Sequence, residues 1–138
     1  MLKWLLISLG SLAASLVLAT LIALELNGVI TVETVNSESR QPRHTHIWYV
    51  EVEDQLMLEA GNPENPWVKD LALSETIVLM GGGLDGVYSF LIHDRDSHDM
   101  IRSSMRSKYG WRDWWISVLF DTSASTAVTV TKVQGIQG

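Results

Sequence analysis

The sequence predicts a mainly β fold: a small, six-stranded antiparallel barrel with a few short helices, preceded by one N-terminal transmembrane helix. Two observations predict it. A charge-free apolar run opens the 138-residue chain, and six short segments of alternating apolar and polar residues follow it. β-Branched and aromatic residues dominate these segments and turn-forming residues bound them, as is typical of strands. Closing such a sheet into a barrel removes its exposed edges.

The apolar run, WLLISLGSLAASLVLATLIAL, covers residues 4–24. At about 1.5 Å of rise per residue, a helix of this length crosses a hydrocarbon layer of about 30 Å. A cleavable signal peptide is the alternative, because Lys3 gives the run a weakly positive start. The small residues that a signal peptidase needs, such as Ala13 and Ser15, lie in the middle of the run. We therefore expect a retained, single-pass anchor over residues 1–26.

The side of the membrane on which the domain lies stays open. Only Lys3 and the amino terminus precede the span, whereas Arg40 and Arg43 follow it at a distance. Basic residues close to a span favour the cytoplasmic side. This distribution leans slightly toward a domain outside the cytoplasm.

The remaining chain divides into one domain, 27–134, and a short C-terminal tail, 135–138. Removing residues 1–26 takes away one basic residue, Lys3, and one acidic residue, Glu25, which leaves 9 basic and 15 acidic residues and a net charge of −6. This acidic balance argues against a nucleic-acid partner, which needs a basic surface. The chain has no cysteine, so disulfides, thiol nucleophiles and thiolate zinc sites are excluded.

Strands are expected in six segments of the domain. They are Val29 to Val35, His46 to Glu53, Gln55 to Ala60, Thr76 to Met80, Val87 to Asp94 and Thr126 to Val133. The segment GGGLDG before the fifth strand satisfies the spacing of a dinucleotide-binding loop, but strand character follows it where that loop needs a helix. We expect a hairpin turn there.

Three helices complete the prediction. A short one begins near Pro66, where the missing N–H of proline does no harm. A longer one takes Asp96 or Ser97 as its N-cap, ends at Gly110, and places an apolar residue every four positions on one face. These residues are Ile101, Met105 and Tyr109. The segment WRDWWISVLFDTS then continues as a third helix or a turn.

Two short motifs carry a resemblance to a known family. In NSESRQPR, the residues Ser39, Pro42 and Arg43 match a family pattern GRKSGKPR, although the basic pair is absent and Arg40 stands where glycine is usual. In the next motif, NPxWyxNLxaNPxVxV, the matching residues are Asn65, Pro66, Trp67 and Leu71. With these motifs the chain resembles the flavin- and deazaflavin-dependent oxidoreductases of the split β-barrel superfamily, relatives of pyridoxamine-phosphate oxidase, and in particular their deazaflavin-dependent nitroreductase branch.

The resemblance implies a six-stranded antiparallel split β-barrel that binds FMN or a deazaflavin coenzyme. The implied cofactor-binding residues are Arg43, Thr45, Asn65, Trp67 and Lys69. It also implies a homodimer with its cofactor grooves at the interface, although the deazaflavin branch includes monomers. The implied reaction is hydride transfer to a small or lipid-soluble acceptor of the quinone or nitroaromatic type.

The residues themselves support part of this assignment. Two prolines, Pro63 and Pro66, stiffen the loop that leads into a short helix, and the positive end of a helix dipole together with Lys69 suits a phosphate group. The alternative is that Trp67 is a core residue and Lys69 a solvated charge. Arg43, at the start of a strand, offers a planar fork for a phosphate or a ring carbonyl, or is a surface arginine.

Histidines and acidic residues raise a metal hypothesis that we do not favour. His44 and His46 form an H-x-H pair, and HDRDSHD, residues 93–99, gathers further nitrogen and carboxylate ligands. The second cluster lies at a strand-to-helix junction, where Asp and Ser usually act as caps. No side chain is an obvious general acid or base, and Tyr49, Tyr88 and Tyr109 are only candidates for that role.

A basic stretch without acidic residues, Arg102 to Arg112, runs into the tryptophans Trp111, Trp114 and Trp115. It predicts a patch that rests on anionic lipid headgroups, a wall of a cofactor or quinone site, or a core helix with a solvated face. Two other functions stay open for the whole domain. One is a redox-inactive split barrel that binds a lipid or hydrophobic ligand, and the other is an envelope interaction domain.

Overall fold

The computed structural model describes residues 1–134, so the expected C-terminal tail, 135–138, lies outside the described residues. Its elements are α1 (Leu2–Glu25), β1 (Val29–Val35), β2 (Pro42–Val52), β3 (Gln55–Ala60), α2 (Pro66–Asp70), the 3-10 turn η1 (Leu71–Leu73), β4 (Thr76–Met80), β5 (Gly86–Ile92), the 3-10 turn η2 (Arg95–Ser97), α3 (His98–Tyr109), α4 (Trp111–Leu119) and β6 (Thr126–Lys132). All six predicted strands and the three predicted helices after α1 are present.

The strands form a closed antiparallel barrel in the order β1-β2-β3-β6-β5-β4, which confirms the predicted fold class. The barrel closes through pairing between β1 and β4. Strand β2 begins at Pro42, four residues earlier than expected, because β1 offers it a pairing partner as far as Val35. A proline is tolerated there because the first residue of a strand need not donate to the ladder.

Strand β2 pairs with two different strands along its length. Residues 42–48 pair with β1, and residues 49–52 pair with β3. Within the described chain, the first half of β2 therefore has a strand on one side only. This open edge lies between the start of α2 and the end of α1.

The barrel interior is filled by alternate residues of the strands. The fully buried side chains include Ile30, Val32, Leu58, Leu79 and Val128. Trp67 and Leu71, from α2 and η1, pack against this cluster. The period-2 pattern of the sequence thus places one face of each strand in the core, as expected for a small barrel.

Helix α3 covers the outer face of the barrel. Its buried side chains Ile101, Met105 and Tyr109 lie on one face, as the four-residue spacing predicted, and pack against outward-pointing residues of β2, β3 and β6. The glycine segment before β5 is a hairpin turn between β4 and β5, also as predicted. Its Gly82 has φ +63° and lies close to Ile30 and Tyr49, so a side chain there would be both strained and crowded.

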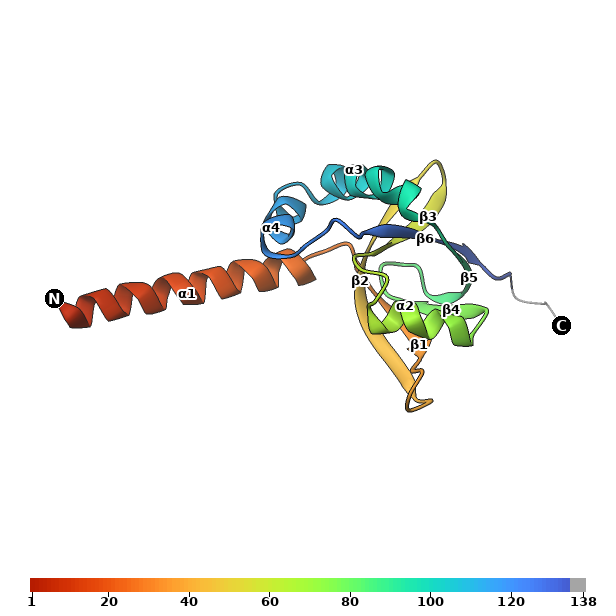
Figure 1. Ribbon diagram of the computed structural model, residues 1–138, viewed down its shortest axis with the longest axis horizontal. Coiled ribbons are helices and arrows are strands. Elements are labelled where there is room, and N and C mark those ends of the chain that lie inside the picture. The colour runs from red at the N-terminus through yellow and green to blue at the C-terminus, as the bar shows by residue number, and fades with distance from the viewer. Residues whose placement is uncertain (135–138) are drawn as a thin grey trace.

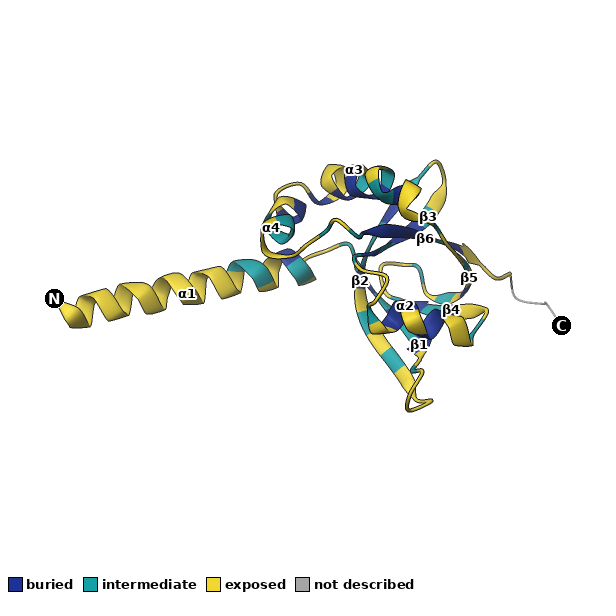
Figure 2. Cartoon of the chain, in the orientation of Figure 1, coloured by how far each residue is buried: buried dark blue, intermediate teal, exposed yellow. Residues whose placement is uncertain are grey.

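Helix α1 projects from the domain as a single rod, and the two described ends of the chain lie at opposite ends of the molecule (Figure 1). Its 24 residues are long and apolar enough to cross a membrane, by length and composition. Almost all of α1 is exposed, and burial begins only in its last turns (Figure 2). There Ala23 is fully buried against the domain.

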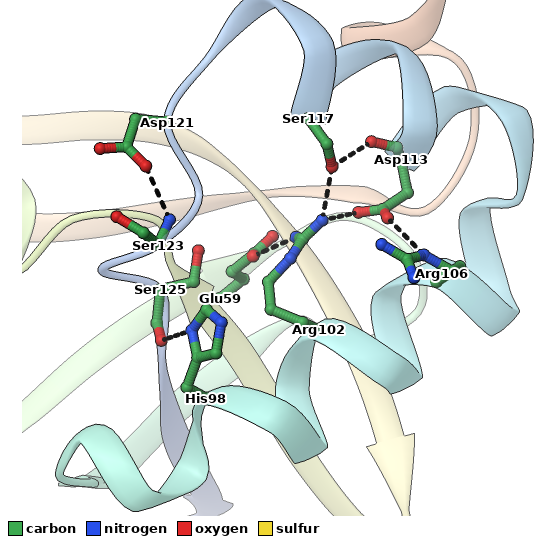
Figure 3. A network of polar contacts seen from close by, with 9 residues as sticks. All are labelled: Glu59, His98, Arg102, Arg106, Asp113, Ser117, Asp121, Ser123 and Ser125. Carbon is green, nitrogen blue, oxygen red and sulfur yellow. Dashed lines mark hydrogen bonds and ion pairs between the residues drawn. The ribbon is translucent and has the colours of Figure 1, made fainter.

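Two of the four basic residues in the stretch from Arg102 to Arg112 are buried, which removes them from any contact with lipid headgroups. The Arg102 guanidinium is buried and bonds to Glu59 of β3, Asp113 of α4 and the hydroxyl of Ser117 (Figure 3). Arg112 is also buried. Both arginines are structural because each satisfies buried acceptors on neighbouring elements. The tryptophans differ, since Trp111 and Trp114 are exposed on the outer side of α4.

Candidate functional site

A groove runs along the open edge of β2 and has a volume of about 570 Å³. Its walls come from β2, from the loop before α2, from the last turn of α1 and from α4. The lining residues are Leu24, Glu25, Arg43, His44, Thr45, His46, Ile47, Trp48, Glu59, Asn65, Pro66, Trp67 and Ile116. Four of the five predicted cofactor-binding residues, all except Lys69, are among them.

Arg43 is held at one end of this groove by a buried carboxylate. Its Nε lies 2.7 Å from Oδ2 of Asp70, and the Thr34 hydroxyl donates to the same oxygen at 2.9 Å. The backbone N–H of Ser37 donates to the other carboxylate oxygen. Among residues 1–134 no partner engages the two terminal nitrogens of Arg43. The fork therefore keeps donors for a phosphate or a carbonyl oxygen.

The environment of Asp70 keeps its carboxylate charged. Burial raises the pKa of this carboxyl, but the hydrogen bonds from Ser37, Arg43 and Thr34 and the positive charge of Arg43 outweigh it. The pKa of Asp70 therefore lies below its ordinary value of 3.8. Sequence reasoning did not single out Asp70. Its spacing of three from the buried Trp67, which puts both on one face of α2, is the signal that could have found it.

The start of α2 has fewer donors for an anion than its sequence suggested. Asn65 is the N-cap and Pro66 follows it, as predicted. The backbone N–H groups of Val68 and Lys69 already donate to the Asn65 carbonyl, and the N–H of Asn65 donates to Asn62. Pro66 has no N–H, so Trp67 carries the one amide of this turn without a described partner.

Lys69 and Trp67 have surroundings different from those of Arg43. The Lys69 ammonium lies 2.7 Å from the Glu64 carboxylate, on an exposed surface beside the groove. Trp67 is only 4% exposed and is part of the barrel core, although one edge reaches the groove. The structure thus gives Trp67 a packing role and gives Lys69 a partner that an anion would have to replace.

Thr45 and the two histidines lie on opposite faces of β2, as the strand spacing predicted. Thr45 pairs in register with the inward-facing Val32, whereas His44 pairs with Glu33. His44 Nε2 is 2.8 Å from the Glu33 carboxylate, and His46 Nδ1 is 3.0 Å from the Glu25 carboxylate. The His46 contact ties β2 to the end of α1 at the rim of the groove.

The end of α1 and the middle of α4 complete the groove, and sequence reasoning missed both. Leu24 and Glu25 contribute from α1, and Ile116 contributes from α4. The indole N–H of Trp48 donates to the Leu24 carbonyl at 3.2 Å, which fixes this wall against β2. No local sequence signal could have found these residues, because they meet only after the barrel has closed.

The tyrosines considered as acid or base residues lie away from the groove. The Tyr109 hydroxyl lies 2.6 Å from the Gly28 carbonyl oxygen and 2.7 Å from the Tyr49 carbonyl oxygen, which share its single proton, and it accepts the backbone N–H of Tyr49. Burial raises the pKa of Tyr109 to about 12. Tyr88 lies in the barrel core, and burial raises its pKa as well. The ring of Tyr49 is covered by the Lys108 ammonium at 3.3 Å.

The histidine and acidic clusters of the sequence are dispersed. His93 bonds to the hydroxyl of Thr129, and His98 bonds to the backbone carbonyl of Ser125. Over residues 1–134, no group of three or more His, Asp or Glu side chains is arranged to hold a metal ion. The groove therefore offers one arginine fork, two imidazoles, two carboxylates and several apolar side chains.

Neither protein-family models nor curated proteins match the sequence, but solved structures match the fold. The heme storage protein HutZ of Vibrio cholerae is 12% identical, with 82% of this chain and 87% of that chain covered and a TM-score of 0.57. The chain shares the split-barrel fold of this protein. At such low identity the likeness shows the fold alone.

Two further structures with this fold have names that refer to an oxidase family and to a reductase. One is a protein of the pyridoxinephosphate oxidase family from Clostridium acetobutylicum, related to general stress protein 26. It is 17% identical, with 86% of this chain and 84% of that chain covered and a TM-score of 0.51. The other is an F420-H2-dependent reductase, 13% identical over 75% of this chain and 94% of that chain, with a TM-score of 0.51.

Proposed function

We propose that the protein is a membrane-anchored oxidoreductase that binds a flavin-type cofactor, FMN or a deazaflavin, in the groove along β2. In this proposal residues 1–26 form the anchor and residues 27–134 form the catalytic barrel. The observation that carries it is the convergence of Arg43, Thr45, Asn65 and Trp67 on one groove of a split barrel. Structures with this fold include an F420-H2-dependent reductase and a member of the pyridoxinephosphate oxidase family.

The groove fits such a group in size, and Arg43 supplies one positive charge, while the Glu25 and Glu59 carboxylates also line the groove. Ligand pockets commonly measure about 300 to 1,000 Å³, and this groove has a volume of about 570 Å³. The terminal nitrogens of Arg43 would hold a phosphate or a ring carbonyl, and the side chains of Thr45 and Asn65 would add neutral hydrogen bonds. Lys69 would contribute only after leaving Glu64. When bound, the cofactor supplies the hydride, while the protein orients it and excludes water.

The position of the groove favours a lipid-soluble acceptor over a freely soluble one. Its wall includes Leu24 and Glu25, at the very end of the candidate membrane span. An acceptor of the quinone type, dissolved in the bilayer, would reach the groove at the membrane surface. The apolar lining residues Leu24, Ile47 and Ile116 also support the alternative function, a redox-inactive barrel that binds a lipid or another hydrophobic ligand.

Titration of the full chain in detergent micelles with FMN and with a deazaflavin tests the cofactor proposal. Replacing Arg43 by Ala would leave Asp70 buried without a partner, so Arg43→Lys is the better variant: it keeps a cation beside Asp70 but removes the fork. We expect Arg43→Lys to weaken cofactor binding roughly tenfold, since a charge-assisted contact contributes about 1.5 to 3 kcal/mol. Thr45→Val should weaken it roughly fivefold.

Two control variants locate the effect. Thr131→Val makes the same chemical change on β6, away from the groove, and should leave the affinity unchanged. Lys69→Ala should change the affinity roughly twofold or less, because Lys69 is exposed and already paired. The assignment of the cofactor site would be contradicted if all four variants bound the cofactor with equal affinity. It would also be contradicted if Lys69→Ala lost more cofactor affinity than Arg43→Lys.

A further inference from the structure

Helix α4 has its polar side chains on the inside and its apolar side chains on the outside. Asp113 and Arg112 are buried, with 0% and 8% exposure. Trp111, Trp114 and Val118 are 56%, 60% and 62% exposed, and Leu119 and Phe120 continue the exposed face. A surface helix of a water-soluble domain has the opposite arrangement.

The buried charges of α4 have partners on neighbouring helices, although Nη2 of Arg112 and Oδ2 of Asp113 have no hydrogen bond within residues 1–134. Asp113 accepts a hydrogen bond from Arg102 of α3, as Figure 3 shows. Arg112 turns toward α1, where its Nε donates to the Ala23 carbonyl and its Nη1 to the Asn27 carbonyl, both at 2.8 Å. These carbonyls are at and just after the C-terminal end of α1, where a helix leaves acceptors unsatisfied. The inward face of α4 therefore attaches this helix to α3 and to the end of α1 by hydrogen bonds.

The outward face of α4 continues the surface of α1. The indole N–H of Trp115 donates to the Thr20 hydroxyl at 3.0 Å. Around this bond lies an apolar crevice of about 280 Å³ between the two helices, lined by Leu16, Val17, Thr20, Leu21, Trp115 and Leu119. In Figure 2, α4 lies beside the C-terminal end of α1, and most of the rod of α1 is exposed.

The depth of this contact follows from the geometry of α1. If the charge-free run ends at Leu24, then Thr20 lies about 6 Å and Leu16 about 12 Å inside the hydrocarbon boundary, at about 1.5 Å per residue. Trp115 and Leu119 touch these residues, so they lie at a similar depth. Arg112 contacts Ala23 and Asn27 instead and lies at the boundary. In-plane amphipathic helices are buried to a comparable depth of about 5 to 10 Å.

We propose that α4 is a second membrane-contacting element, lying in the interface of the same bilayer that α1 crosses, with Trp111, Trp114, Val118, Leu119 and Phe120 in lipid. The bilayer is the occupant that fits because this face carries no charge and is continuous with a helix suited to hydrocarbon. Exposed tryptophans are also enriched at membrane interfaces. The barrel thus sits on two helices in a fixed orientation. This inference rests on the membrane placement of α1 and does not depend on the cofactor.

Site-directed spin labelling of the full chain in phosphatidylcholine vesicles tests the proposal. The chain has no cysteine, so Val118→Cys introduces one unique thiol for a nitroxide label. Val118 is exposed, so the substitution leaves the core intact. We expect the label at 118 to collide preferentially with oxygen, which concentrates in lipid, rather than with a water-soluble nickel complex. Raising the salt concentration should not change the oxygen accessibility of this label, because no basic residue is part of the proposed contact with lipid.

Two labelled control positions separate this inference from the anchor. Leu9→Cys, in the middle of α1, should be at least as lipid-exposed as position 118. Ser103→Cys, on the exposed side of α3, should be accessible to the nickel complex. Lipid exposure at 9 with water exposure at 118 would overturn the inference and leave the anchor intact. Water exposure at both positions, 9 and 118, would also overturn the membrane placement of α1.

The same label distinguishes lipid from a second copy of the chain. If another copy covered α4, the label at 118 would be shielded from both oxygen and nickel, and its spectrum would show dipolar broadening that dilution with unlabelled protein removes. That result would also overturn the inference. A sharp spectrum with high oxygen accessibility is the outcome that we predict.

Discussion

Asp70 joins three segments at the mouth of the barrel, because its carboxylate receives hydrogen bonds from Thr34, Ser37 and Arg43. We predict that Asp70→Asn lowers the free energy of unfolding by roughly 2 to 4 kcal/mol near neutral pH, since it leaves the arginine without its anionic partner. Glu64→Gln, which removes an exposed carboxylate, should change it by about 0.5 kcal/mol or less. Thermal unfolding of the full chain in micelles, followed by circular dichroism, measures both.

The pH dependence of this contribution has a definite sign. The pKa of Asp70 is lowered in the folded chain, so the carboxylate adds stability above the unfolded value of about 3.8, and that stability is lost as the pH falls through the folded pKa. The difference between the wild type and Asp70→Asn should therefore be full at about pH 6 and should shrink below about pH 3.8. A difference that grows toward acid would contradict the lowered pKa.

Gly28 is a second residue whose replacement has a predictable cost. Its φ is +78°, and a Cβ there would lie 2.9 Å from the Tyr109 ring, whose hydroxyl donates to the Gly28 carbonyl. Gly28→Ala should lower the free energy of unfolding by roughly 2 kcal/mol, from backbone strain and displacement of the ring. Gly10→Ala is the matched control, because nothing surrounds Gly10 in α1 and alanine favours a helix. Equal stability of the two variants would refute this account of Gly28.

At the scale of elements, the junction between α1 and the domain determines how the anchor is attached. Arg112 and Trp48 both donate to carbonyls in the last turn of α1 or just after it. Removal of α1 would take away the Ala23 and Leu24 carbonyls, which accept hydrogen bonds from Arg112 and Trp48. The full chain is therefore a better sample than a truncated domain for binding experiments.

We predict that Arg112→Gln loosens α1 from the domain and lowers the free energy of unfolding by roughly 2 to 3 kcal/mol, because charge-assisted bonds to backbone carbonyls are lost. Limited proteolysis should then cut near residues 25–28 faster than in the wild type. Arg106→Gln is the control, because Arg106 is exposed on α3 and makes only a long contact with Asp113. If both variants are cut at the wild-type rate, Arg112 does not hold the junction.

The strands and helices were predictable because each carries a local signal. The period-2 runs predicted the strands of the barrel, and the spacing of Ile101, Met105 and Tyr109 predicted the buried face of α3. The early start of β2 was missed because pairing with β1, and not the composition of residues 42–45, extends the strand. The positions of Arg102 and Arg112 were missed for a related reason: their partners are distant in sequence, so nothing local shows that these charges are buried.

The candidate site was predictable only in part. The family resemblance pointed to Arg43, Thr45, Asn65 and Trp67, and these residues do meet at one groove. Sequence alone could not show that Glu64 pairs with Lys69, or that α1 and α4 wall the groove. Such features depend on how whole elements pack and not on any residue's neighbours in the chain.

At the scale of the whole molecule, the proposed arrangement puts the groove beside the membrane surface and leaves most of the barrel in water. We also expect the chain to form a homodimer, as the family resemblance implies. Sedimentation velocity of the full chain in micelles, with the detergent density-matched, measures the protein mass directly. A single species with the mass of one 15.4 kDa chain at high protein concentration would contradict the dimer.

The central claim, that the groove along β2 binds a flavin-type cofactor, is tested most directly by the absorption spectrum of the purified full chain in micelles. The account predicts a yellow protein with a flavin or deazaflavin band, or a colourless protein that takes up one of these cofactors on dialysis, in either case with less retained by Arg43→Lys. A folded, colourless chain that takes up neither FMN nor a deazaflavin would contradict it. A lipid found by mass spectrometry in that colourless chain would then support the hydrophobic-ligand alternative.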